Sequence, residues 1–224
     1  VSGYKSNIKK LMNNYIPKVH ILYAYPLDSY YREISARESF VYPEMETVLE
    51  DAERLEKLWE NFNAGDKVIK ALIETLQVNP GYDFEMYTYA KAQLGAMSVP
   101  LVMNLYDRQG ERFRDVILLD TIVHELIHRF AASPRKEKSF SMRSYWKYIR
   151  EEYKAEIPAT HHHLIVYAVL LKIMPTLLTT EQLKELEIYY SQHMAPGYKE
   201  ALDMVKEKGP DFFIKEFTDR IIRC

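Results

Sequence analysis

Residues 113–130 constrain the fold more than any other part of the chain. Their apolar side chains recur every three to four positions and form one wide stripe, made of Val116, Leu118, Leu119, Ile122, Val123, Leu126, Ile127 and Phe130. A helix with so broad an apolar face has to be covered by other elements of the same chain. This segment therefore predicts a core helix around which the rest of the fold is arranged.

The patterns around this helix predict an α+β fold, with strands and helices mixed in the first half and mostly helices afterwards. Strands are expected at four β-branched and aromatic stretches, residues 19–25, 39–42, 84–89 and 99–106. Helical spacing marks residues 48–62, 66–76, 145–153 and 160–174. Further helices are expected after Thr179 or Thr180, after Pro196-Gly197 and after Gly209-Pro210.

Three local signals predict where helices begin and end. Asp66 is the expected cap of the helix at 66–76, and Thr160 is the expected cap of the helix at 160–174. Pro175 is expected to stop the latter helix. No repeat or low-complexity linker interrupts the chain, so we expect one domain over residues 1–224, with an N-terminal lobe (1–110) and a helical C-terminal lobe (111–224) around one cleft.

Composition narrows the classes of function. Hydrophobic residues make up 47% and charged residues 28%, as in globular proteins, and the net charge of -2 leaves no excess of basic residues for nucleic acid. The longest apolar run, residues 164–171, is too short to cross a membrane. The single cysteine, Cys224, excludes an internal disulfide and a cysteine-based zinc site. Any metal must therefore be held by histidine and carboxylate side chains.

The sequence His124-Glu125-Leu126-Ile127-His128 lies inside the expected core helix. Residues four apart share one helical face, so both imidazoles can reach a single metal ion. Glu125 is one position on, about 100° around the helix, which places its carboxylate beside the metal rather than on it. There it can take a proton from a metal-bound water and pass it to a leaving amine.

With this motif, residues 99–171 resemble the zincin metallopeptidases, and they include an expected strand before the helix, which lines the substrate cleft in that family. The resemblance implies zinc as the cofactor, His124 and His128 as ligands, Glu125 as the general base, and a peptide or protein as the substrate.

The subfamily patterns of the zincins are not matched. A metzincin would have Gly at 131 and His at 134, where this chain has Ala131 and Pro134. A thermolysin-like gluzincin would have Glu near 147 or 148, where Lys147 and Tyr148 stand. We therefore expect a divergent, gluzincin-like zincin with its third ligand further downstream.

Two downstream segments can supply that third ligand. Glu151, Glu152 and Glu156 lie in a charged stretch typical of a solvated helix face. His161, His162 and His163 open a strongly apolar helix, where a buried histidine needs a hydrogen-bond partner or a metal.

We favour His163 as the third ligand because Tyr167, four residues on, shares its helical face. The phenol of Tyr167 could donate a hydrogen bond to the oxyanion that develops when water attacks a carbonyl. His162 is the next choice, and Glu152 and Glu156 remain alternatives, whereas His161 is expected to cap the helix or hydrogen-bond locally.

Three other polar residues have weaker claims to a role. His193 is expected to end a surface helix rather than to stabilise the transition state. His20 is expected on the face of a strand. Asp120 precedes His124 by four residues and can accept a hydrogen bond from it.

These observations predict a zinc-dependent peptidase. The alternative is a zincin-fold binding or regulatory protein with little or no turnover, and the intact Glu125 favours the enzyme. The chain begins at Val1 rather than Met, as it would after removal of a leader peptide or a tag, so we expect an extracytoplasmic rather than a cytoplasmic location.

Overall fold

A computed structural model describes residues 15–37, 42–90, 96–107, 110–132, 142–154 and 157–222. Within these ranges the protein has a four-stranded mixed sheet and nine α-helices, so it is an α+β protein that is mostly helical, as predicted. The strand predicted at 39–42 falls mainly on residues outside the described ranges, as does Glu156. No described helix combines the length and the hydropathy that a bilayer span requires.

The chain forms two compact units. One comprises Tyr15–Ile69 and Gly81–Leu126, and the other comprises the described parts of Lys70–Pro80 and Ile127–Cys224. Helix α5 (Asp115–Ala132) contributes to both units, whereas the lobes expected from the sequence divide the chain at residue 110.

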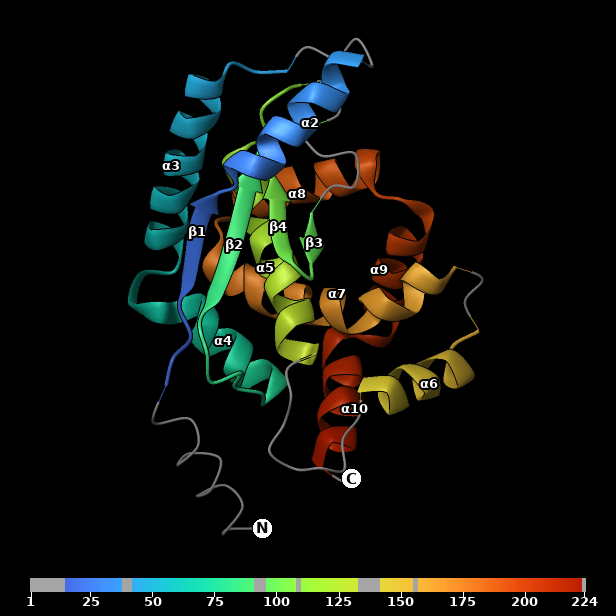
Figure 1. Cartoon of the computed structure of the whole chain (residues 1–224). Coiled ribbons are helices and arrows are strands. Elements are labelled where there is room, and N and C mark those ends of the chain that lie inside the picture. The colour runs from blue at the N-terminus through green and yellow to red at the C-terminus, as the bar shows by residue number, and fades with distance from the viewer. Residues whose placement is uncertain are drawn as a thin grey trace. The chain divides into compact units, whose positions relative to one another are not determined.

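The sheet of the first unit has the strand order β1–β2–β4–β3 (Figure 1). Strands β1 (Val19–Tyr23), β2 (Phe84–Tyr89) and β4 (Leu101–Asn104) run parallel to one another, and the short β3 (Met97–Ser98) pairs antiparallel with β4. Three of the predicted strands are therefore confirmed. Because β4 lies between β2 and β3, the strand expected to line a substrate cleft has neighbours on both sides, and the shorter β3 forms the edge of the sheet.

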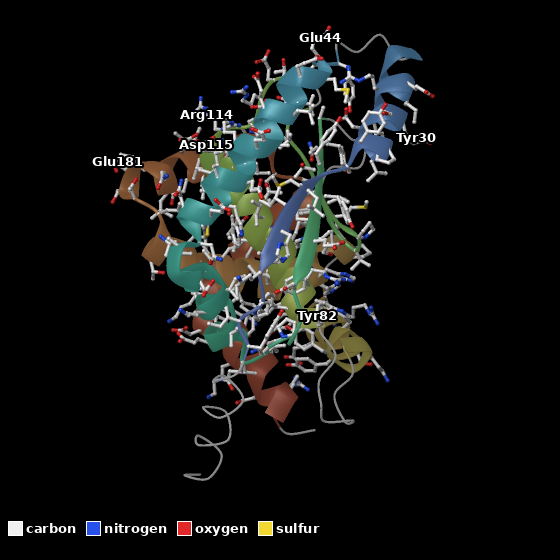
Figure 2. All side chains as sticks on the ribbon, turned by 60° about the vertical axis from the view of Figure 1, so that its left-hand side comes forward. Tyr30, Glu44, Tyr82, Arg114, Asp115 and Glu181 are labelled. Atoms are coloured by element: carbon white, nitrogen blue, oxygen red, sulfur yellow. The ribbon has the colours of Figure 1, made fainter. Side chains whose placement is uncertain are left out.

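Helix α2 (Tyr25–Arg37) was not predicted, because its aromatic start continues the strand-like pattern of residues 19–25. Its buried Asp28 carboxylate accepts hydrogen bonds from the hydroxyls of Tyr23 (2.9 Å) and Tyr42 (2.7 Å) and from the backbone N–H of Ala90 (2.7 Å). Tyr42 and Ala90 lie 14 and 62 residues from Asp28, so tertiary contacts stabilise a helix that local propensity does not indicate. Tyr30 lies on the exposed side of this helix (Figure 2).

Helix α3 (Met45–Phe62) lies alongside β1 and buries Leu55 and Trp59 (Figure 1). An ion pair between Arg54 on α3 and Asp115 ties this helix to the start of α5 (Figure 2). Thus α3 contacts both the sheet and the helix that carries His124, Glu125 and His128.

The prediction that Asp66 caps the next helix is wrong. After a short 3₁₀ turn, η1 (Ala64–Asp66), helix α4 runs over Lys67–Leu76. The side-chain oxygen of Asn63 accepts a hydrogen bond from the N–H of Val68 at 3.0 Å. Because Asn63 reaches forward over the turn, it satisfies the N–H group that the Asp66 side chain was expected to bind.

The second unit is built from helices. It contains most of α4 and the end of α5. It also contains the complete helices α6 (Met142–Glu152), α7 (Pro158–Leu177), α8 (Thr180–His193), α9 (Pro196–Lys208) and α10 (Pro210–Ile222). Helix α7 is buried over most of its length and packs against α9 and α10 (Figure 1). The strong hydrophobicity of residues 164–171 therefore reflects a central core helix.

Both boundary predictions for α7 need correction. The helix begins at Pro158, with Ile157 as its N-cap, because proline suits the first turn, where its missing N–H has no intrahelical partner. Thr160 therefore lies inside the first turn. Pro175 lies inside the last turn, where losing one hydrogen bond costs less than at mid-helix, and α7 continues to Leu177. For α8, Thr179 rather than the alternative Thr180 is the N-cap, in a capping box with Gln182.

Candidate metal centre

Three histidines come together in the structure. One ring nitrogen from each of His124, His128 and His163 lies within 4.8 Å of the other two. His124 and His128 are one turn apart on the continuous helix α5, so helical geometry sets their spacing. His163 comes from α7, and its ring centroid lies 5.0 Å from that of His128, nearly at right angles. These are the three residues that the sequence predicted as metal ligands.

The spacing and the donor set suit a transition-metal ion such as zinc. Nitrogens around tetrahedral zinc are about 3.3 Å apart, because each Zn–N bond is about 2.0–2.1 Å long. The observed upper limit of 4.8 Å is therefore within reach of small adjustments of the rings. Three protein ligands with an open fourth position are typical of catalytic zinc, whereas structural zinc sites use four.

A hydrogen bond to the backbone fixes the tautomer of His163. Its Nδ1 lies 2.7 Å from the carbonyl oxygen of Ala159. A carbonyl only accepts, so Nδ1 carries the proton and donates it, and the lone pair is on Nε2. Such a backbone contact commonly fixes the tautomer and orientation of a metal-binding histidine.

Burial keeps the imidazoles of His128 and His163 in their neutral form. Burial, together with the neighbouring His163 and His162, lowers the pKa of His128 to about 3. Burial also lowers the pKa of His163 to about 4, against the raising effect of its hydrogen bond to Ala159. Because metals bind the unprotonated ring, both side chains are ready to act as ligands at neutral pH.

Glu125 follows His124 on α5 and is buried, with 8% of its surface exposed. Burial raises the pKa of this carboxyl group to about 7. A group with a pKa near the working pH can both take up and release a proton, which is the property that a general acid–base catalyst needs.

The other two histidines of the run on α7 have different partners. The Nε2 of buried His161 donates to the carbonyl oxygen of Tyr153 at 2.6 Å, as expected for a local hydrogen bond. His162 is exposed and stacks on Trp146, with ring centroids 4.8 Å apart and planes 9° apart. Consecutive residues point about 100° apart around a helix, so only one of the three can face α5.

The acidic alternatives do not join the three histidines in the described part of the chain. Glu152 is exposed at the end of α6. Its neighbour Glu151 lies 3.7 Å from Lys147 in an i,i+4 pair on the same helix, as expected for a solvated face. Glu156 lies outside the described residues. Among the described alternatives, the structure therefore brings His163, and neither His162 nor Glu152, to the histidines of α5.

Two tyrosines accompany His163. Tyr167 is buried, and its ring centroid lies 6.1 Å from that of His163 on the same side of α7. Tyr198, on α9, is closer, with a centroid distance of 4.0 Å and 36° between the planes. The sequence did not indicate Tyr198, because it is far from His163 along the chain and only the packing of α9 on α7 brings them together.

The remaining predicted residues lie as follows. Asp120 is buried one turn before His124 on α5. His193 is exposed as the last residue of α8, where its ring stacks on Tyr189, in agreement with the expected helix end. His20 is exposed on β1, 3.6 Å from Asp83, as expected for a histidine on a strand face.

Comparison with known proteins gives no match to a family model, to a curated protein or to a solved structure.

Proposed function

We propose that this protein is a zinc-dependent peptidase of a divergent, gluzincin-like zincin type. The observation that carries the proposal is the grouping of one nitrogen each from His124, His128 and His163 within 4.8 Å. The sequence places the acid Glu125 directly beside the first of these ligands. The substrate that we propose is accordingly a peptide or a protein.

The chemistry divides between the metal and the chain. Zinc, when bound, polarises a carbonyl oxygen and lowers the pKa of a coordinated water. Glu125 accepts the proton that the attacking water loses and then donates it to the nitrogen of the leaving amine. The raised pKa of its carboxyl group, about 7, suits both steps because neither form is strongly favoured at neutral pH.

Tyr167 is the residue that we propose to stabilise the developing oxyanion. Its hydroxyl can donate a hydrogen bond, and its place one turn after His163 keeps it near the third ligand. Its burial in α7 favours a fixed orientation, which makes a hydrogen-bond donor effective in catalysis.

A binding or regulatory protein without turnover is the competing possibility. Both functions need the three histidines, so metal binding alone does not distinguish them. A buried carboxyl group is costly to keep beside a purely structural site, and this favours the enzyme.

The decisive experiment measures zinc content and cleavage of a diverse peptide library by the same purified variants. We expect one zinc per chain in the wild type and in Glu125→Gln, with turnover of the latter reduced by about 10²- to 10⁴-fold. His163→Ala should lose zinc. His162→Ala is the matched control, because it removes the adjacent exposed histidine, and it should keep both zinc and activity.

Three outcomes of this experiment would contradict parts of the proposal. Full turnover in Glu125→Gln would exclude this residue as the base. Zinc binding without cleavage of any peptide by the wild type would instead support the binding or regulatory protein. Loss of zinc in His162→Ala but not in His163→Ala would overturn the choice of third ligand.

A further inference from the structure

An aromatic ring from a different helix packs closely on His163. The ring of Tyr198, in the first turn of α9, lies with its centroid 4.0 Å from that of the imidazole. His163 already has one restraint, the 2.7 Å hydrogen bond from its Nδ1 to the carbonyl oxygen of Ala159. The hydrogen bond fixes one edge of the imidazole, and the tyrosine ring covers one of its faces.

The start of α9 is held firmly against the start of α7 on either side of Tyr198. Gly197 approaches so closely that a Cβ atom there would lie 2.7 Å from Cγ2 of Ile157 and 3.3 Å from Cβ of Ala159. A side chain at this position would overlap with Ile157 unless one of the two segments shifted. The backbone carrying Tyr198 is therefore seated directly on the turn from which His163 projects.

A second contact fixes the other side of the same turn. The hydroxyl of Thr160 donates to a carboxylate oxygen of Glu200 at 2.6 Å. Thr160 has almost no exposed surface and Glu200 is half-buried, so breaking this hydrogen bond would leave a buried hydroxyl without its acceptor. With Gly197 before it and Glu200 after it, Tyr198 has little freedom to move away from the imidazole.

We propose that Tyr198 is a positioning residue that holds the imidazole of His163 in the orientation required for metal binding, and that the first turn of α9 supports it. This inference rests on the metal site of the proposed function. The aromatic ring, rather than the hydroxyl, carries the role, because ring packing on the imidazole face is the observed contact. Side chains that orient a ligand in this way typically contribute about 10- to 100-fold to metal affinity.

The test is the zinc dissociation constant, measured by competition with a chromophoric chelator and without any substrate. Tyr198→Ala should bind zinc about 10- to 100-fold more weakly, whereas Tyr198→Phe, which keeps the ring, should bind like the wild type. Tyr189→Ala is the matched control, because Tyr189 also stacks on a histidine, His193, that is outside the metal centre. It should leave zinc affinity unchanged.

Cobalt(II) absorption provides a second readout, which a general loss of stability would not alter. The ligand-field bands of Tyr198→Ala should differ from those of the wild type in position or intensity, and those of Tyr198→Phe should not. If Tyr198→Ala fails to fold, Tyr198→Leu fills much of the same volume without an aromatic plane and should show the same weakening.

The outcomes separate this inference from the proposed function. Wild-type affinity in both the alanine and the leucine variants would overturn the inference and leave the metal site intact. Equal weakening in Tyr198→Phe would overturn it in favour of a role for the hydroxyl. Failure of the wild type to bind zinc would overturn the metal site itself, and the inference with it.

Discussion

In the metal-free protein, we expect the buried imidazole of His163 to make the fold less stable as the pH falls. The pKa of His163 is about 4 in the folded protein, mainly because burial disfavours its charged form, compared with 6.5 for an ordinary histidine. Between these two values the unfolded chain carries a proton that the folded chain lacks. The stability associated with the neutral ring is therefore complete above about pH 6.5 and is lost as the pH falls towards 4.

The magnitude follows from this difference of one proton. Each pH unit over which the unfolded chain holds the extra proton costs about 1.4 kcal/mol. From pH 7 to pH 5, His163 alone should lower the free energy of unfolding by about 2 kcal/mol. Glu125 acts in the opposite direction, because its pKa is raised, so the effect of His163 has to be isolated by a variant.

The contribution of His163 can be isolated by comparing the wild type with His163→Asn. The free energy of unfolding of both proteins is measured in urea, with excess EDTA, at pH 7 and pH 5. Asparagine cannot titrate, but its amide can still donate to the carbonyl of Ala159. The stability of the wild type relative to the variant should fall by about 2 kcal/mol between the two pH values. His162→Asn, at an exposed neighbouring position, should change the pH dependence less. If the free energy of unfolding changed with pH by the same amount in the wild type and in His163→Asn, a buried, neutral imidazole at position 163 would be refuted.

Two further predictions concern stability. Replacing Asp28 by alanine leaves the hydroxyls of Tyr23 and Tyr42 and the N–H of Ala90 without their buried acceptor. We expect a loss of about 3–5 kcal/mol in urea unfolding, whereas Asp203→Ala, at an exposed position on α9, should have almost no effect. Equal losses in the two variants would argue against the Asp28 network. Zinc at 1,000 times its dissociation constant should stabilise the wild type by about 4 kcal/mol, seen as a rise in melting temperature that EDTA reverses. An unchanged melting temperature would contradict a zinc site formed in the folded state.

The sequence predicted α5 and β2 well, because the spacing of their apolar residues is regular. The apolar stripe of residues 113–130 became α5, and its Ile122, Val123, Leu126, Ile127 and Phe130 are completely buried. Strand β2 has the bounds expected from its alternating and aromatic residues. In both cases the side chains that define the pattern are also those that the core removes from water, so local and tertiary preferences agree.

The predictions failed where a remote contact outweighs the local signal. Helix α2 starts in a strand-like tyrosine stretch, yet Asp28 within it accepts hydrogen bonds from Tyr42 and Ala90, 14 and 62 residues away. Similarly, Thr160 is a favourable N-cap residue by type, but its hydroxyl is occupied by Glu200 on α9. Local sequence patterns do not include partners that lie this far away along the chain.

For the metal centre, the sequence by itself determined the pair on α5. His124 and His128 are four residues apart in a strongly periodic helix, and the geometry of any α-helix then places them on one face. Tertiary structure decided the rest. Whether His161, His162 or His163 faces that pair depends on the rotation of α7 about its axis, which its packing against α9 and α10 sets. The place of Tyr198 on His163 likewise depends on the close approach of Gly197 to Ile157, because a contact between two helices is fixed by the fit of their surfaces and not by the spacing of residues within either one.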